Sequence, residues 1–212
     1  MKNKILLSLG VLILINNFSF FELKSQIKNV IVVKVGNSLI TSIDIENEII
    51  TNLLINKQEI TQENINNNKN YSIKNLIKKL IKKNEINKYE IKKYSKDDLQ
   101  NYINSVAKKF NTNTIGLKEI FIKSGVSYDS FVEKYETELL WNTLIFHIYK
   151  NQININMIDV ENEIEKIKIN KNEIEIEKLK EKILIQKKQE KLNLFSRSHY
   201  SNLENTIPIN FQ

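Results

Sequence analysis

Residue types that carry out nucleophilic or metal chemistry are sparse in this sequence. The chain has no cysteine, and its two histidines, His147 and His199, lie far apart. A Ser-His pair could form only in the run FSRSHY, where Ser196 and Ser198 are close to His199. Serine catalysis also needs a group that orients the histidine and a site for the oxyanion, and the sequence supplies neither. We therefore interpret the run as the C-terminal end of a helix, where Arg197 and His199 interact favourably with the negative end of the helix dipole.

Other signatures of enzymes are missing as well. The patterns G-x-S-x-G, G-x-G-x-x-G and H-E-x-x-H and the phosphate-binding P-loop do not occur. We expect His147 to be a packed or half-exposed helix residue and not a metal ligand. The acidic residues of 159–190 alternate with lysines at helical spacing, as in Glu175–Lys178, and predict surface charge pairs instead of a metal cluster. The sequence therefore predicts no catalytic, cofactor-binding or metal-binding residue, and no enzyme activity.

The charge of the chain does not indicate a nucleic-acid-binding protein. Lys and Arg number 32 against 25 Asp and Glu, a formal charge of +7. The excess is spread along the predicted helices and not gathered in a basic arm. Even the lysine-rich stretch of one helix is expected to be a solvated face. Its lysines are Lys74, Lys78, Lys79, Lys82 and Lys83.

The N-terminus resembles a secretory signal peptide. Lys2 and Lys4 precede an apolar run, Ile5–Ile15, which is shorter than the roughly 20 residues that span a membrane. We predict cleavage after Ser25 and export to the periplasm. Leu23 fits the small-residue rule at the cleavage site poorly, so retention as a membrane anchor stays open. Export without cysteine means that no disulfide holds the fold.

Composition and periodicity predict a mainly helical protein. The chain is 41% apolar and has only 4 Gly and 1 Pro. Its opening reads as a strand over 30–35, a Gly36-Asn37 turn, a short strand over 38–40 and a helix over 42–57. Thr41 or Ser42 caps this helix, and Asp44 completes a capping box.

Further helices follow from caps and apolar spacing. Residues 58–70 are polar and predict a loop, after which Ser72 caps a second helix. Ser95 caps a third helix, and Thr114 caps a short helix over 115–123 that Gly125 ends. A long helix is predicted over 128–149. Its apolar stripe contains Tyr128, Phe131, Val132, Tyr135, Leu139, Phe146 and Tyr149.

The tail allows two readings before its final strand. We favour a long, charged helix over 175–200. The alternative is a hairpin turning at 170–172, because Ile167 and Ile169, then Ile174 and Ile176, alternate with polar residues. Residues 207–211, with Pro208, predict an edge strand.

Three phrases of this sequence resemble the N-terminal part of the SurA family of periplasmic chaperones. The first is the opening Val-Gly-Asn-Ser-Leu-Ile-Thr-x-x-Asp-Ile, residues 35–45. The second is a rhythm of Lys109, Asn111, Leu117, Gly125, Val126 and Phe131. The third is Ile-x-Ile-x-x-x-Asp-Val-Glu, residues 153–161.

The chain departs from that family where a parvulin prolyl-isomerase module is expected. The GG-x-LG turn is absent, and no Gly follows Gly125. The resemblance therefore implies a signal peptide over 1–25, a SurA-like helical domain over 26–165 and a C-terminal helix and strand over 166–212. It also implies that Ile207, Ile209 and Phe211 pair beside residues 30–35, so that both ends of the chain form one small β element.

By this resemblance the protein is expected to be an ATP-independent periplasmic chaperone. It would hold unfolded outer-membrane proteins during export and assembly, without cofactors, nucleic acid or stable membrane insertion once the signal is cleaved. Two alternatives remain: a folding factor related to prolyl isomerases, and a membrane-anchored helical adaptor. Tyr128, Tyr135, Trp141, Phe146 and Tyr149 are candidates for client contact, but their positions favour packing in the core.

Overall fold

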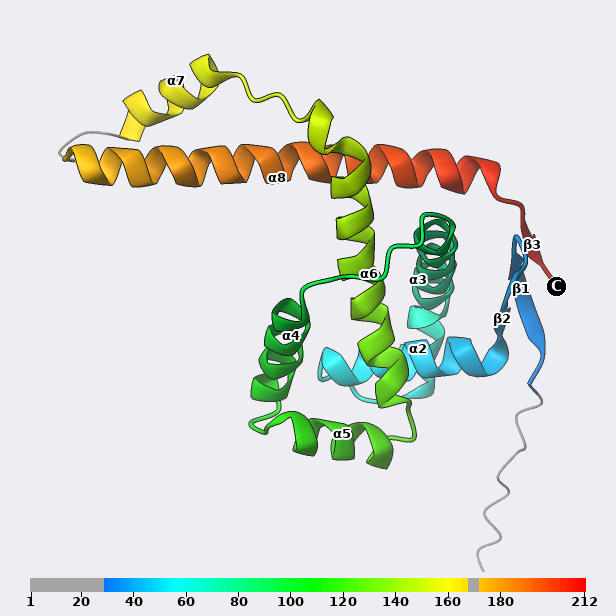
Figure 1. Ribbon diagram of the computed structural model, residues 1–212. Helices are drawn as coiled ribbons and strands as arrows, with labels where there is room; N and C mark the ends of the chain where they lie inside the picture. The colour runs from blue at the N-terminus through cyan, green and yellow to red at the C-terminus, as the bar shows by residue number, and fades with distance from the viewer. Residues whose placement is uncertain (1–28, 168–171) are drawn as a thin grey trace, which may run out of the picture.

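The computed structural model describes residues 29–167 and 172–212 (Figure 1). In this part the chain forms seven α-helices and one three-stranded antiparallel sheet made from strands near both ends. This confirms the prediction of a mainly α fold with a small β element. The predicted signal peptide, residues 1–25, lies outside the described residues.

The sheet joins the two ends of the described chain. Its order is β2 (Ser38–Thr41), β1 (Ile31–Val35), β3 (Ile209–Phe211). The turn between β1 and β2 uses Gly36 at φ +56°, a conformation that favours glycine. Val35 lies opposite Ile209 and Val33 opposite Phe211, which confirms the predicted pairing for those two residues of the tail. Ile207 does not join the strand; it caps the preceding helix, α8.

The first helix was predicted closely, but the second begins earlier than expected. α2 spans Ser42–Ile55, and the Thr41–Asp44 capping box is present. α3 spans Gln62–Lys88 with Thr61 as its cap, so the predicted loop was wrong over 62–70. Ile65 explains the extra turns, because it packs against the core beside β1. Ser72 is no cap: it is buried and accepts a hydrogen bond from the amide of Asn52 (3.3 Å).

The middle helices lie where the sequence placed them. α4 spans Lys96–Lys109 with Ser95 as its cap, and α6 spans Tyr128–Tyr149. α5 spans Thr114–Lys123, and Gly125, whose φ is +72°, follows its C-cap, Ser124. Its cap is Asn113 and not Thr114, because the Asn113 side chain accepts from the backbone N–H of Gly116 (3.0 Å).

The tail forms two helices, and the hairpin alternative was wrong. After the short 3₁₀ helix η1 (Lys150–Gln152), α7 spans Met157–Ile167 and α8 spans Glu173–Thr206. Ile174 and Ile176 belong to α8; Ile169 lies outside the described residues. A capping box between Asn172 and Glu175 begins α8. The Glu175 carboxylate therefore accepts the backbone N–H of Asn172 instead of forming the predicted pair with Lys178.

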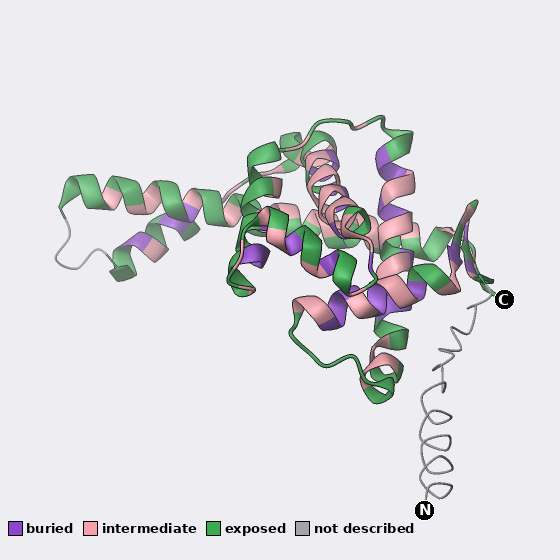
Figure 2. Ribbon diagram, turned by 90° about the horizontal axis from the view of Figure 1, so that it is seen from below, coloured by how far each residue is buried: buried purple, intermediate pink, exposed green. Residues whose placement is uncertain are grey.

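Two views give the arrangement of the helices. α6 runs across the middle of the molecule, between α8 at one end and α2, α4 and α5 at the other (Figure 1). α7 packs along the N-terminal half of α8, and the two project from the body as an arm (Figures 1 and 2). In the arm, Val160, Ile164 and Ile183 form a small core of their own. In residues 29–167 and 172–212, no helix has the length and hydropathy needed to cross a membrane.

Candidate functional site

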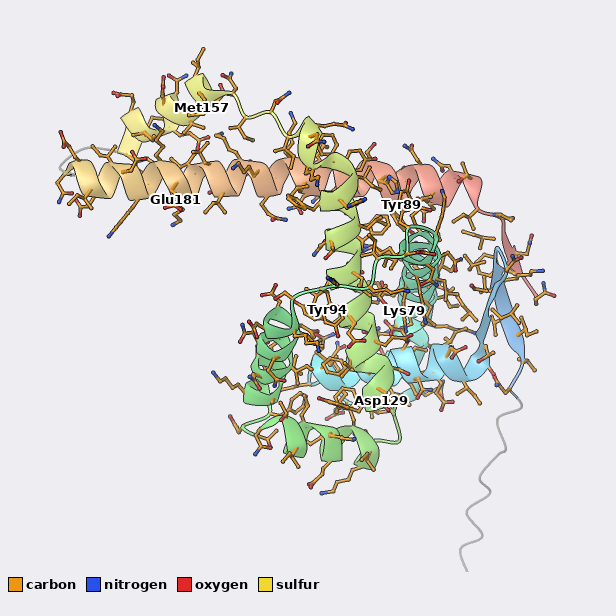
Figure 3. All side chains as sticks on the ribbon, viewed as in Figure 1. Lys79, Tyr89, Tyr94, Asp129, Met157 and Glu181 are labelled. Carbon is orange, nitrogen blue, oxygen red and sulfur yellow. The ribbon has the colours of Figure 1, made fainter. Side chains whose placement is uncertain are left out.

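Ion pairs between α3 and α6 fix the central helix. Lys79 and Lys83 both bind the carboxylate of Glu133, and Lys82 binds Glu138. Figure 3 labels Lys79 on α3, next to α6. Burial alone would raise the pKa of Glu133, but hydrogen bonds from the two lysines outweigh it and lower that pKa. The expectation that these lysines form a solvated helix face was therefore wrong for three of the five.

Lys82 is the buried cation among these α3–α6 ion pairs. Only 4% of the residue is exposed, and its ammonium lies 5.4 Å from the centroid of the Trp141 ring. Burial lowers the pKa of Lys82 below its usual 10.5, and the ion pair with Glu138 opposes that shift without cancelling it. The folded chain thus holds this proton less readily than the unfolded chain does.

Replacing Lys82 with methionine tests this cost. At neutral pH we expect Lys82→Met to leave the free energy of unfolding unchanged or to raise it by about 1 kcal/mol, since it removes a buried charge while water still solvates the Glu138 carboxylate, whose side chain is 43% exposed. A lowered lysine pKa adds stability as pH rises from that pKa towards 10.5, because the unfolded state then holds more protons. The stability of the wild type relative to the variant should therefore increase as pH rises towards 10.5. Urea unfolding across this range measures the gap, with exposed Lys74→Met as the control; a gap independent of pH would contradict the assignment.

A polar junction joins α8 to α3 and α6. The ring nitrogens of His199 lie 2.9 Å from the hydroxyl of Tyr149 and 3.2 Å from the carboxylate of Glu85. The indole N–H of Trp141 donates to the hydroxyl of Ser196 (2.8 Å). The interpretation of FSRSHY as a helix end was wrong, because α8 continues to Thr206. These groups connect α8 to α3 and α6.

His147 does not take part in that junction. The structure places it on an exposed face of α6, so it is not packed in the core. Within the described residues, no group of three or more His, Asp or Glu side chains could hold a metal ion.

A crevice lies beside the junction, where α4, α6 and α8 meet. Its volume is about 380 Å³. Polar side chains such as Asn142 and Gln189 share its lining with the apolar Leu139, Ile145 and Leu192. Phe146 also lines it and is 51% exposed, which is unusual for a large aromatic residue. Nearby, the hydroxyl of Tyr94 donates to Glu136 (2.6 Å) and ties the segment before α4 to α6 (Figure 3).

The other aromatic candidates have different surroundings. Trp141 is 1% exposed, and Tyr128 packs edge-on against Phe121 in the core next to α5. Tyr149 stacks on Phe195 at the α6–α8 contact, with ring centroids 4.7 Å apart. Tyr135 stacks on Tyr102, with ring centroids 3.7 Å apart, in a second cleft between α2, α3 and α6. Core packing thus describes Trp141, Tyr128 and Tyr149, whereas Phe146 is free for contact.

Exposed apolar side chains continue from the crevice along the arm. The sequence predicted a charged helix here without identifying these residues; the signal that could have found them is the apolar residues outside the stripe that the arm buries. They are Met157, Ile158, Ile167, Ile174, Ile185 and Leu194, each at least 41% exposed. Ile174 and Ile185 share one face of α8 with Gln189 and Leu192 of the crevice, because these residues are spaced near whole helical turns, whereas Leu194 lies on the opposite face. We term Phe146, Ile185 and Ile174 the apolar track. Such a surface suits binding of apolar segments without a fixed sequence.

Comparison with known proteins gives no relative from which a function could be transferred. No protein-family model and no curated protein matches the chain.

Proposed function

We propose that this protein is an ATP-independent holding chaperone of the SurA type that binds unfolded outer-membrane proteins in the periplasm during their export and assembly. It would be exported by its N-terminal signal peptide and would act without the parvulin modules. Its mechanism would be reversible capture of extended apolar segments by the crevice and the apolar track.

The observation that carries the proposal is the exposure of Phe146 within the crevice. A soluble protein normally buries a phenylalanine, and burying one contributes about 1.5–3 kcal/mol. An aromatic ring left half exposed, between polar side chains that keep the crevice hydrated, offers a contact that an unfolded chain can make and release. The charged residues of the arm keep the remaining apolar track in solution.

The shape of the molecule also supports capture of a long segment. The arm and the group of α4 and α5 lie on the same side of α6 and border an open space (Figure 1). An extended chain could follow the apolar track from Phe146 past Ile185 to Ile174 and need not enter a closed pocket. The SurA-like opening phrase and the pairing of β3 with β1 favour a chaperone over the adaptor alternative.

Light scattering tests the proposal. An outer-membrane barrel protein is unfolded in urea and diluted with or without the purified protein, and no ATP is added. We expect suppression of aggregation near stoichiometric amounts. No suppression by a well-folded protein would refute the holding function and leave the adaptor role.

A matched pair of variants locates the site. Phe146→Ser should raise the amount needed for half-suppression by about fivefold, since it removes most of one apolar contact. Ile122→Ser is the control, because Ile122 is 64% exposed on α5 and does not line the crevice. An equal loss in both variants would contradict the assignment to the crevice.

A further inference from the structure

The sheet has an open edge at β3. Gly36 N–H donates to the carbonyl of Pro208, and Gln212 N–H donates to the carbonyl of Val32, both at 2.9 Å. Hydrogen-bonded pairs alternate along an antiparallel ladder, so Asn210 pairs with Lys34. The N–H and C=O groups of Ile209 and Phe211 therefore point away from β1. Among the described residues, none bonds to these backbone groups.

The side chain of Phe211 is exposed at a position that belongs to the core layer. It stands opposite Val33, which is fully buried, yet Phe211 is 66% exposed. Side chains alternate between the two faces of a strand, so Phe211 lies on the face that packs on the helices. It stays exposed because the sheet ends at β3. A further strand would cover it.

A groove runs along this edge, between β3, α3 and the end of α8. Its volume is about 600 Å³. Tyr71, Tyr200 and Phe211 supply aromatic surface, and Lys74, Lys78 and Glu204 supply charge. Glu204 accepts a hydrogen bond from the hydroxyl of Tyr200. Neither lysine forms an ion pair with another described residue. The groove thus has a net positive charge.

We propose that β3 and this groove bind an extended peptide segment as a fourth strand of the sheet. The segment has apolar side chains at alternate positions, which cover Phe211 and the tyrosines, and a carboxylate that lies near Lys74 and Lys78. Strand addition at an open edge uses backbone hydrogen bonds for affinity and alternate side chains for selectivity. This site lies apart from the crevice and does not depend on the holding function.

A labelled peptide tests the site in the purified protein. The probe is a six-residue peptide of alternating threonine and valine with a free C-terminal carboxylate, and binding is followed by fluorescence anisotropy. Binding should slow amide hydrogen exchange at Ile209 and Phe211 by about tenfold, because the N–H groups of these two residues gain partners in the peptide. The exchange rate at Asn210, whose backbone already pairs with β1, should not change. The amidated peptide should bind more weakly. No binding up to about 1 mM, or binding without protection of these two amides, would overturn the proposal.

Variants separate the backbone and side-chain contributions. Phe211→Pro removes an N–H that β1 does not use and should weaken binding by about tenfold more than Phe211→Ala does. Lys78→Glu should weaken binding of the peptide with a free C-terminal carboxylate more than binding of the amidated peptide. Asn210→Ala should leave the affinity for both peptides unchanged. Equal affinity of Phe211→Pro and the wild type would contradict strand addition. Dimerisation of the protein that Phe211→Pro abolishes would assign the edge to a second copy of this chain and would also overturn the proposal.

Discussion

Trp141→Ala is expected to lower the free energy of unfolding by about 3–5 kcal/mol, the usual cost of removing a fully buried Trp side chain. Trp141 is 1% exposed and lies where α3, α6 and α8 meet. Its loss would leave a cavity under Lys82 and remove the hydrogen bond to Ser196. Because the indole lies at the contact of α8 with α3 and α6, we expect α8 to loosen first. Urea unfolding gives the free energy, and amide exchange in α8 identifies the helix that loosens.

Two milder variants divide the effect of Trp141 into its parts. Trp141→Phe keeps an aromatic ring but loses the N–H donor, whereas Ser196→Ala leaves that donor without its partner. We expect Ser196→Ala to cost about 1–3 kcal/mol, the penalty of an unsatisfied buried group. If Trp141→Ala cost no more than Ser196→Ala, the packing role assigned to the indole ring would be wrong.

Phe121→Ala should cost a similar amount, about 3–5 kcal/mol, but in another part of the protein. Phe121 is fully buried on α5 and lies 4.9 Å from Phe131 and 5.6 Å from Tyr128, measured between ring centroids. Removing it opens the core shared by α4, α5 and α6. Amide exchange should rise in α4 and α5 and stay unchanged in the sheet.

The neighbouring residue is the matched control for Phe121. Ile122 is 64% exposed on the same helix, so Ile122→Ala should change the free energy of unfolding by less than about 0.5 kcal/mol. Comparable losses for the two variants would contradict the assignment of Phe121 to the core and of Ile122 to the surface of α5.

Local signals in the sequence predicted the ends of most elements. The Thr41–Asp44 capping box, the Ser95 cap and the turn at Gly125 each depend on residues within a few positions of one another, and all three are present. The pairing of Ile209 and Phe211 with β1 is not local. It was expected from the resemblance to the SurA family, and the register confirms it.

The wrong predictions concern contacts between distant residues. Lys79 and Lys82 looked like solvent-exposed charges because their partners, Glu133 and Glu138, lie on a helix more than fifty positions away. The segment around His199 was predicted to end a helix because the partner of His199, Glu85 of α3, lies 114 positions away in the sequence. The first turns of α3 were missed because asparagine has low helix propensity, while Thr61 and the packing of Ile65 stabilise them.

The candidate site was predicted only in part. Phe146 was among five aromatic candidates, but its exposure depends on how α4 and α8 flank α6 and could not be read from periodicity. The exposed residues of the arm, such as Ile174 and Ile185, were also beyond prediction, because a two-helix arm buries only one stripe of each helix.

Site-specific cross-linking tests the central claim, that the crevice captures unfolded chains, most directly. A photoreactive benzophenone side chain is placed at position 146 in one sample and at position 122 in another. An unfolded outer-membrane protein is then added without ATP and the mixture is illuminated. We expect position 146 to cross-link to the client before the client folds, and position 122 to yield little product. Equal cross-linking from both positions, or none from position 146, would contradict capture in the crevice.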